Sequence, residues 1–371
     1  MKRVIILGCT GSIGSTALRA IRKGELPIQV VGLSSNTDMN ALSALALEFK
    51  VEAVCLTSTE MQELPYTKTF SFKSGLKQML HTLQADIVLN AIAGFDGLFA
   101  SISALEQGFD LALANKESIV CSGSYLFALA ERHKATIIPV DSEHAAISEL
   151  LYNRKREEIA SLILTASGGP LRTLEKKDFA SITVEQALAH PTWSMGRKIS
   201  IDSATMANKA LEIIEASRLF GFSADQIEVV IHPQSIVHSM IRTNDGAVYA
   251  QLGVPDMTLP IINALDRGHS SLIKSLDFTN LNLSFEKPDT EKFPLLSLAF
   301  YILQSKGSYA LAFNAADEIA VASFLERRIS YPKLIEVVEK TLSHDWKSES
   351  ESFEETLVLD KMARDIARSY L

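Results

Sequence analysis

A short apolar run, followed at once by three glycines, opens the chain and constrains its fold more than any other feature. The run Val4–Leu7 is β-rich, and Gly8, Gly11 and Gly14 follow it before a helical stretch. A strand, a glycine loop and a helix in that order allow backbone N–H groups to approach a pyrophosphate at the helix N-terminus. Because the spacing is GxxGxxG rather than GxGxxG, a tight turn without a ligand is the alternative.

The same alternation of β-rich and helical stretches continues to about residue 140. It predicts an α/β fold, with a Rossmann-like, doubly wound parallel sheet that carries helices on both faces. The predicted strands are Val4–Leu7, Gln29–Leu33, Ala53–Leu56, Ile87–Asn90, Leu111–Ala114 and Thr136–Pro139. The predicted helices are Ser15–Arg22, Ala41–Phe49 and Gly97–Gln107.

The pattern changes after Asp141 and predicts a central α/β or α+β domain followed by a C-terminal helical bundle. Segment boundaries fall at 1–140, 141–265, a linker at 266–294 that is rich in Ser, Asn and Asp, and 295–371. Central helices are expected at 145–152 and 207–220, strands at 159–165 and 228–231, and a hairpin of 237–242 with 247–252. C-terminal helices are expected at 295–304, 310–326, 332–342 and 353–370.

The charge balance excludes one broad class of partner. Lys and Arg total 36 and Asp and Glu total 44, which gives a formal net charge of −8 over 371 residues. An acidic chain without a basic block is a poor candidate for nucleic-acid binding. No apolar window approaches the ~18–20 residues that span a membrane. Three cysteines without CxxC spacing disfavour disulfides and zinc sites, so a cytoplasmic location is expected.

The end of the second predicted strand bears on cofactor choice. An NAD-preferring site usually has an acidic residue there for the ribose hydroxyls. This chain instead has Ser34-Ser35-Asn36-Thr37, whose hydroxyl and amide groups can donate to a 2′-phosphate. NADP is therefore favoured, with Asn36 as a candidate contact, although Asp38 follows and no Lys or Arg lies in the segment.

Two further loops follow predicted strands, where ligands gather in parallel sheets. Asp141 and Glu143 stand two residues apart, and such carboxylates can converge on a hard divalent cation. The Ser167-Gly168-Gly169 turn offers a hydroxyl and bare amides to a phosphate. A solvated acidic turn and an ordinary loop are the respective alternatives.

The densest run of polar residues lies at 190–212. Asn208 and Glu212 are four residues apart, so they share one helix face, and Lys209 is close to the helix start. This helix start could hold a phosphate with Ser203, Asn208 and Lys209, and a metal with Glu212. A surface helix with a polar face is the alternative. Trp193, in a segment without periodicity, favours a mobile lid over a buried anchor.

These segments together resemble the 1-deoxy-D-xylulose 5-phosphate reductoisomerase family over nearly the whole chain. The segments that carry the resemblance are GCTGSIGS at 8–15, LANKES at 113–118, PVDSEHAAI at 139–147, SGGP at 167–170, HPTWSMGRKISIDSATMANKALE at 190–212, HPQSIVHSM at 232–240, GVPDM at 253–257 and FNAADEIAV at 313–321.

The resemblance implies a role for each matched residue. The implied NADPH contacts are Thr10, Gly11, Ser12 and Ile13 at the pyrophosphate, with Asn115, Glu117 and Gly196 bordering the cofactor. The implied ligands of Mg²⁺ or Mn²⁺ are Asp141, Glu143 and Glu212, which with Lys116 form the implied catalytic set. The implied substrate contacts are Lys116, Ser142, Glu143, Ser167, His190, Trp193, Ser203, Asn208, Lys209 and Glu212, with Trp193 and Met195 in a closing flap.

The implied reaction rearranges and reduces 1-deoxy-D-xylulose 5-phosphate to 2-C-methyl-D-erythritol 4-phosphate in the methylerythritol phosphate route to isoprenoids. The implied enzyme is a homodimer with a phosphorylated ketose as substrate, and the segments 1–140, 141–265 and 295–371 become its NADPH-binding, catalytic and helical domains. The lysine often seen near the 2′-phosphate in this family is missing from Ser34–Thr37. A metal-free NADP-dependent reductase of the semialdehyde type and a non-catalytic NADP-sensing protein are the competing interpretations.

Overall fold

The structure, a computed structural model, describes residues 1–23, 26–266 and 271–371. The chain divides into two compact units. The first unit comprises Met1–Ser118, Leu126–Ala145 and Asp256–Lys274, and the second comprises Ile119–Tyr125, Ala146–Pro255 and Ser275–Leu371. Each unit has its own sheet. The predicted segments stay a prediction, with boundaries at 1–140, 141–265, 266–294 and 295–371.

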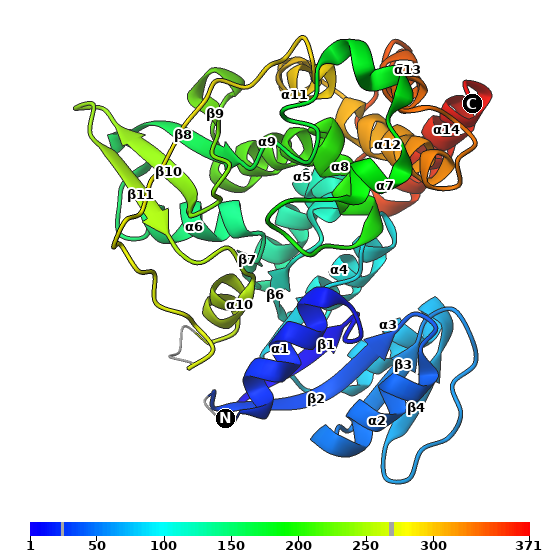
Figure 1. Cartoon of the computed structure of the whole chain (residues 1–371). Helices are drawn as coiled ribbons and strands as arrows, with labels where there is room; N and C mark the ends of the chain where they lie inside the picture. The colour runs from blue at the N-terminus through cyan, green and yellow to red at the C-terminus, as the bar shows by residue number, and fades with distance from the viewer. Residues whose placement is uncertain (24–25, 267–270) are drawn as a thin grey trace. The chain divides into compact units, whose positions relative to one another are not determined.

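A parallel sheet in the order β4-β3-β2-β1-β5-β6-β7 forms the centre of the first unit (Figure 1). Its strands are β1 (Lys2–Leu7), β2 (Ile28–Ser35), β3 (Ala53–Leu56), β4 (Lys68–Ser71), β5 (Ile87–Asn90), β6 (Asp110–Leu113) and β7 (Ile137–Pro139). The strand order reverses at β1, which pairs with both β2 and β5. The predicted doubly wound sheet is confirmed, and its switch point lies at the glycine loop, where such sheets bind ligands.

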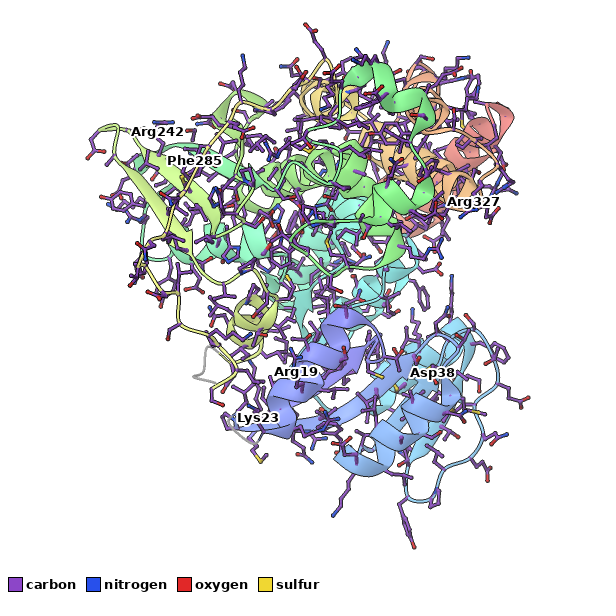
Figure 2. All side chains as sticks on the ribbon, in the orientation of Figure 1. Arg19, Lys23, Asp38, Arg242, Phe285 and Arg327 are labelled. Atoms are coloured by element: carbon purple, nitrogen blue, oxygen red, sulfur yellow. The ribbon has the colours of Figure 1, made fainter. Side chains whose placement is uncertain are left out.

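Helices cover the sheet because their apolar faces match its buried strands. The helices of this unit include α1 (Ser12–Arg22), α2 (Met39–Phe49), α3 (Phe72–Thr82), α4 (Asp96–Glu106) and α10 (Thr258–Leu265). In α1, Leu18 and Ile21 are buried, whereas Arg19 is exposed on the outer side, as is Lys23 just after the helix (Figure 2). All four residues of Val4–Leu7 are fully buried, as a central strand requires.

Sequence patterns do not reveal several elements of the structure, among them β4, α3 and α5 (Lys116–His133). β4 is an edge strand, and its sequence Lys-Thr-Phe-Ser lacks the apolar run of the central strands. α5 is interrupted at Ser122, whose φ of −148° is not helical. A strand without strong burial and a helix with a break carry weak periodicity, so patterning cannot identify them.

A four-stranded sheet in the order β11-β10-β8-β9 belongs to the second unit. Its strands are β8 (Ile159–Ala166), β9 (Ile227–Ile231), β10 (Val237–Thr243) and β11 (Val248–Leu252). β10 runs antiparallel to β8 and β11, whereas β8 and β9 are parallel. The predicted hairpin is confirmed, with Gly246 at a φ of 88° in its turn.

Helices make up the rest of the second unit. They include α7 (Val184–Leu188), α8 (Arg197–Thr205), α9 (Ala207–Phe220), α11 (Pro294–Gln304), α12 (Tyr309–Leu325), α13 (Tyr331–Leu342) and α14 (Phe353–Ser369). α12 is the most buried of the C-terminal helices and packs against α13 and α14. The C-terminal helical bundle is confirmed, with helix ends within one residue of the predicted ones.

Between α10 and α11, the described residues 271–293 contain no helix or strand beyond an isolated bridge from Glu286 to Ile231. The linker at 266–294 stays a prediction, and its residues 267–270 lie outside the described residues. Among the helices that the structure describes, none is long and apolar enough to cross a membrane.

Candidate active site

The glycine loop is a turn whose shape depends on missing side chains. Gly8 has a φ of +76°, and a Cβ there would come within 2.7 Å of the Ala91 carbonyl oxygen. A Cβ on Gly14 would come within 2.5 Å of the Gly8 carbonyl oxygen and 2.6 Å of the Cys9 Cα. Since backbone atoms lie on both sides, the chain can pass through this turn only with glycine at these positions.

The N-terminus of α1 faces this turn with free donor capacity. Gly11 is the N-cap residue and makes no side-chain capping bond. The first backbone N–H groups of a helix have no intrahelical acceptor, so they can donate to an anion. Ser12 and Ile13 provide two of them, and their contact with a pyrophosphate stays a prediction.

Two buried serines at the end of β2 fix the loop in place. The Ser34 Oγ accepts from the Gly8 N–H at 3.2 Å, and the Ser35 and Thr10 hydroxyls lie 2.9 Å apart. Both serines are buried, so they support the loop rather than face a 2′-phosphate. Of the four residues Ser34–Thr37, only Asn36 and Thr37 are exposed, so only these two stay candidates for the 2′-phosphate.

Asn36 is joined by residues that sequence reasoning missed. The hydroxyls of Thr57 and Ser58, just after β3, both donate to the Asn36 Oδ1. Ser58 is also exposed. Because β2 and β3 are neighbours, their loops lie together at one sheet edge. The sequence contained one signal for Thr57 and Ser58, since they directly follow the predicted third strand, Ala53–Leu56, and the second and third strands of such a sheet lie side by side.

The Asn-Lys-Glu segment after β6 is held by a network around Asn115. The Asn115 Oδ1 accepts from the Ser118 N–H at 2.9 Å and caps α5. Its Nδ2 donates to the Gly94 carbonyl oxygen at 2.8 Å and to Glu117 at 2.9 Å. All of Asn115, Lys116 and Glu117 are buried. The segment is therefore a rigid platform beside the switch point of the sheet.

Lys116 and Asp141 form an ion pair at the ends of adjacent strands. β6 and β7 are parallel neighbours, so the residues that follow them meet at the same edge. The Lys116 Nζ lies 2.5 Å from the Asp141 Oδ2, and both side chains are largely buried. Burial would raise the pKa of Asp141, but the charge of Lys116 and the contact with His144 hold it well below its usual range.

Asp141 and Glu143 fit a hard divalent cation. Carboxylate oxygens of these two residues lie within 4.8 Å of one another. Between them the Ser142 Oγ donates to Glu143 at 2.5 Å. Oxygen donors of this kind suit Mg²⁺ or Mn²⁺. The predicted convergence of Asp141 with Glu143 is therefore present in the first unit.

Glu212 lies in the second unit, in the first turns of α9. It is almost fully buried, as is Lys209. The Asn208 Nδ2 and the Lys209 Nζ both donate to its carboxylate. The expectation that Asn208 and Glu212 share one helix face is confirmed. These three side chains form a charged group whose members contact one another, and joint ligation of one ion by Asp141, Glu143 and Glu212 stays a prediction.

Ser167 and His190 lie together beside the Ser-Gly-Gly turn. The His190 Nδ1 accepts from the backbone N–H groups of Thr192 and Trp193, at 3.2 and 2.9 Å. The ring proton must then be on Nε2, which lies 3.0 Å from the Ser167 Oγ and donates to it. Burial lowers the pKa of His190. A neutral His190 thus leaves the Ser167 O–H free to donate to an anion.

The same turn packs directly on α8. A Cβ on Gly169 would come within 2.4 Å of the Ser203 carbonyl oxygen, and Gly169 has a φ of +68°. The turn therefore lies against Ser203 because it carries no side chain. Ser167, His190 and Ser203 are brought together in one place, and Met206 then turns the chain into α9 and its Asn208 and Lys209.

The segment before α8 is irregular. Residues 191–196 form no helix or strand, and Trp193 is neither exposed nor buried. Its ring lies 6.5 Å from that of His238. The segment thus has no regular structure, and Trp193 lies beside His238. Its movement as a flap stays a prediction. His232 is fully buried and hydrogen bonded at both ring nitrogens, and its ring stacks on Phe285, which indicates a structural role.

Comparison with known proteins gives one family throughout. Family models described as 1-deoxy-D-xylulose 5-phosphate reductoisomerase, its C-terminal domain and the DXP reductoisomerase C-terminal domain match residues 4–123, 137–220 and 252–366. The enzyme of that name from Treponema pallidum is 44% identical over 372 residues, which cover 100% of this chain and 97% of the relative. That from Chlorobium chlorochromatii is 44% identical over 382 residues and covers both chains fully.

Solved structures agree with the sequence relatives. The reductoisomerase from Zymomonas mobilis in complex with NADPH superposes with a TM-score of 0.91 at 37% identity, covering 99% of this chain and 98% of that one. A reductoisomerase in complex with NADPH, fosmidomycin and magnesium gives a TM-score of 0.91 at 36% identity, covering 100% and 98%. The chain belongs to the 1-deoxy-D-xylulose 5-phosphate reductoisomerase family.

Proposed function

We propose that this chain converts 1-deoxy-D-xylulose 5-phosphate to 2-C-methyl-D-erythritol 4-phosphate with NADPH and a divalent cation. The observation that carries the proposal is the ion pair of Lys116 with Asp141 beside Glu143, at the carboxyl ends of β6 and β7. A reductase that works without a metal has no need for these buried charges. Family membership and the solved relatives with NADPH and magnesium support the same conclusion.

The cofactor site uses the backbone of the first unit. The uncapped N-terminus of α1 would bind the pyrophosphate, with Thr10, Gly11, Ser12 and Ile13 around it. Asn36 would contact the 2′-phosphate region, and Asn115 and Glu117 would border the cofactor. NADPH, when bound, supplies the hydride that reduces the aldehyde formed by the rearrangement.

The metal site would use Asp141, Glu143 and Glu212. When bound, a divalent cation stabilises negative charge on the substrate oxygens during the rearrangement. Ser142 would accept from a substrate hydroxyl, since its own O–H donates to Glu143 while its backbone N–H donates to Asp141. Lys116, buried at 6% exposure, would supply further positive charge or a proton to the substrate. Its pairing with Asp141 holds its ammonium group in place for that task.

The phosphate end of the substrate would be bound by the second unit. Ser167, Ser203, Asn208 and Lys209 would donate to its oxygens, and His190 would orient Ser167 through its Nε2–H. This binding energy is remote from the reacting carbons and can be used to position them. Trp193 and Met195 would close over the substrate as a flap and exclude water, with Gly196 near the cofactor.

The test is NADPH oxidation by the purified chain with 1-deoxy-D-xylulose 5-phosphate, with and without added Mg²⁺ or Mn²⁺. We expect oxidation that requires both substrate and metal, with the methylerythritol phosphate as product by mass spectrometry. Equal rates after treatment with EDTA would instead support the metal-free semialdehyde-type reductase. The absence of oxidation with any metal would contradict the proposed activity altogether.

Two further expectations concern the assembled enzyme and its location. The homodimer implied by the family is proposed here and can be tested by the mass of the protein in solution, by sedimentation or light scattering. A cytoplasmic location is also proposed, supported by the absence of disulfide pairing, since Cys9, Cys55 and Cys121 are all free and buried.

A further inference from the structure

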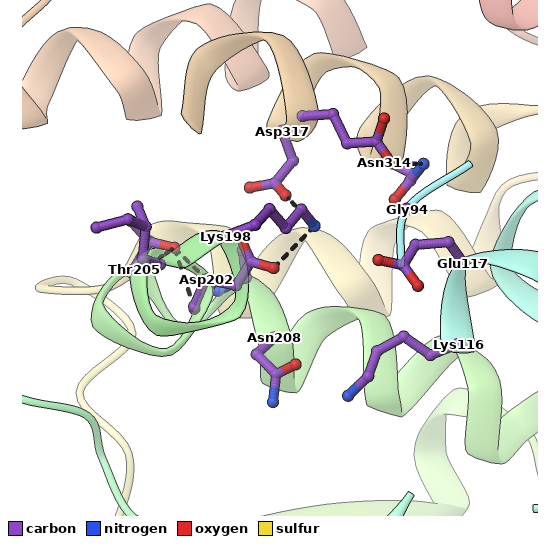
Figure 3. A network of polar contacts seen from close by, with 12 residues as sticks. Gly94, Lys116, Glu117, Lys198, Asp202, Thr205, Asn208, Asn314 and Asp317 are labelled. Atoms are coloured by element: carbon purple, nitrogen blue, oxygen red, sulfur yellow. Dashed lines mark hydrogen bonds and ion pairs between the residues drawn. The ribbon is translucent and has the colours of Figure 1, made fainter. Parts of the chain in front are cut away.

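Lys198 lies between two buried carboxylates and has no role in the site described above. Its Nζ is 2.8 Å from the Asp202 Oδ2 and 2.9 Å from the Asp317 Oδ2 (Figure 3). Asp202 is 2% exposed and Asp317 is not exposed at all. One ammonium group is thus shared by two buried acidic side chains. Buried charges of this kind are costly unless they are paired, so the arrangement constrains where Lys198 can be.

The position of Lys198 in its helix shows that it is not there for local stability. It stands in the first turn of α8, which begins at Arg197 directly after the 190–196 segment. A cation at a helix N-terminus is disfavoured by the helix dipole. Asp202 is four residues along the same helix and compensates for this locally. Asp317, however, belongs to α12, so the second ion pair joins α8 to the C-terminal helices.

A second polar contact holds the other end of α8. The Tyr331 hydroxyl on α13 donates to the Ala204 carbonyl oxygen at 2.9 Å, and Tyr331 is fully buried. Ser203, the proposed phosphate contact on α8, lies between this point and Lys198 in sequence. The C-terminal helices therefore hold α8 at both ends, and with it Ser203 and the start of α8, where the 190–196 segment joins.

We propose that Lys198 and Asp317 are positioning residues for substrate binding, which act through α8 on the flap and on Ser203. Neither residue is among those assigned above to the substrate or the cofactor. The proposal rests on the phosphate site of the proposed function. It gives the C-terminal helical bundle a task in the reaction, namely to fix the C-terminal end of the flap segment so that closure brings Trp193 and Ser203 to the same place each time.

Removing the charge of Lys198 and removing that of Asp317 have different consequences. Lys198→Met would leave Asp202 and Asp317 buried without their shared cation, so we expect this variant to fold poorly. Asp317→Asn keeps the side-chain shape and leaves the local pair of Lys198 with Asp202 intact. It removes only the charge that joins α8 to α12. Asp317→Asn is therefore the informative substitution.

The experiment measures KM and kcat for the substrate, the Kd for NADPH, and the change in tryptophan fluorescence when fosmidomycin and Mg²⁺ are added. The chain has two tryptophans, and Trp346 is buried in the C-terminal part. A parallel titration of Trp193→Phe shows how much of the signal comes from the flap. For Asp317→Asn we expect KM to rise about tenfold, because coupled residues of one network affect each other on this scale. We also expect a smaller Trp193 signal and an unchanged NADPH Kd.

A matched control exists in the same helices. Arg364 on α14 also lies between two carboxylates, at 2.6 Å from the Glu318 Oε2 on α12 and 2.6 Å from the Asp360 Oδ2. Glu318→Gln removes one carboxylate of this second ion-pair group, whose members lie on α12 and α14, so we expect a lower melting temperature with an unchanged KM.

Two results would overturn the proposal. One is an Asp317→Asn enzyme that melts earlier but keeps the wild-type KM and Trp193 signal, which is the result of a purely structural role. The other is the same rise in KM for Glu318→Gln. If the wild-type chain does not turn over the substrate, the proposed function fails, whereas an active wild type with an unchanged Asp317→Asn variant contradicts only this inference.

Discussion

The molecule contains two candidate phosphate sites that are built from different materials. The loop at the start of α1 would bind a phosphate with backbone N–H groups, and the side chains that support the loop are serine and threonine hydroxyls. The region of α8 and α9 instead gathers buried charges, with Lys209 paired to Glu212 and Lys198 to two aspartates. The first site is shaped by the path of the chain, and the second by a balance of charges.

The two sites are therefore expected to be sensitive to different kinds of substitution. A backbone site tolerates changes of exposed side chains and fails when the path of the loop changes. A site of buried charges fails when one charge is removed, because its partner is then left buried and unpaired. It also explains how an acidic chain of net charge −8 can bind two phosphorylated ligands, since the attraction is local at both places.

The largest effect is expected from Glu212→Gln in the second site. The neutral amide removes the negative charge that a divalent cation requires and leaves the buried Lys209 without its partner. We expect kcat to fall by about 100-fold or more, the size of a lost interaction of a few kcal/mol with the reacting charge. NADPH binding, measured by its fluorescence, should stay within about twofold of wild type.

The control for that variant is Glu326→Gln, an acidic residue just after α12 that is more than half exposed. Its turnover should match wild type, since exposed ion pairs contribute little. Unchanged turnover of Glu212→Gln at saturating Mg²⁺ would exclude Glu212 from the metal site. It would also show that the second site does not depend on this buried charge.

The second largest effect is expected from Gly14→Ala in the glycine loop, which should weaken NADPH binding. The added Cβ would collide with the backbone of Gly8 and Cys9, so the loop must move away from the α1 N-terminus. We expect the NADPH Kd to rise about tenfold or more, whereas Ser12→Ala, which changes only an exposed side chain, should alter it less than about threefold. Circular dichroism checks that both variants fold. Equal effects of the two substitutions would show that the loop is not a backbone site.

The smallest effect concerns pH and His190. Burial lowers the pKa of His190 from its ordinary value of 6.5 in the folded state, so folding favours the neutral ring. The stability that this provides is complete above pH 6.5 and is lost as the pH falls below 6.5 through the folded pKa. Protonation of Nδ1 would also displace the N–H groups of Thr192 and Trp193.

The comparison that isolates this effect is thermal melting of wild type and His190→Gln between pH 8 and 5. Carboxylates titrate in both proteins, so only the difference between the two curves reports on His190. We expect the wild-type melting temperature to fall more steeply than that of His190→Gln below pH 6.5. Parallel curves would show that the ring does not titrate in this range.

Sequence patterns predicted the buried parts of the fold well. The strands Ala53–Leu56 and Ile87–Asn90 and the helix Ala207–Phe220 match the structure at both ends. Each is buried or strongly amphipathic, so its periodicity is the signature of the packing that stabilises it. β4 and the broken helix α5 were missed because an edge strand and a helix with a break at Ser122 do not depend on such a pattern.

The candidate site was predictable in its members and not in its contacts. Asn208 and Glu212 were placed on one face from their spacing alone, because a helix fixes that geometry. The contacts of Ser58 with Asn36 and of Asp317 with Lys198 join residues that are far apart in the chain. No spacing rule covers such pairs, since tertiary structure alone brings them together.

One measurement tests the contrast between the two sites most directly. After removal of divalent metal with EDTA, NADPH binding and substrate-dependent NADPH oxidation are measured on the same sample. We expect an NADPH Kd within about twofold of its value with Mg²⁺, because a backbone site needs no added charge. Oxidation should be lost without metal and restored by Mg²⁺ or Mn²⁺. Oxidation that persists without metal, or NADPH binding that disappears with it, would contradict the account.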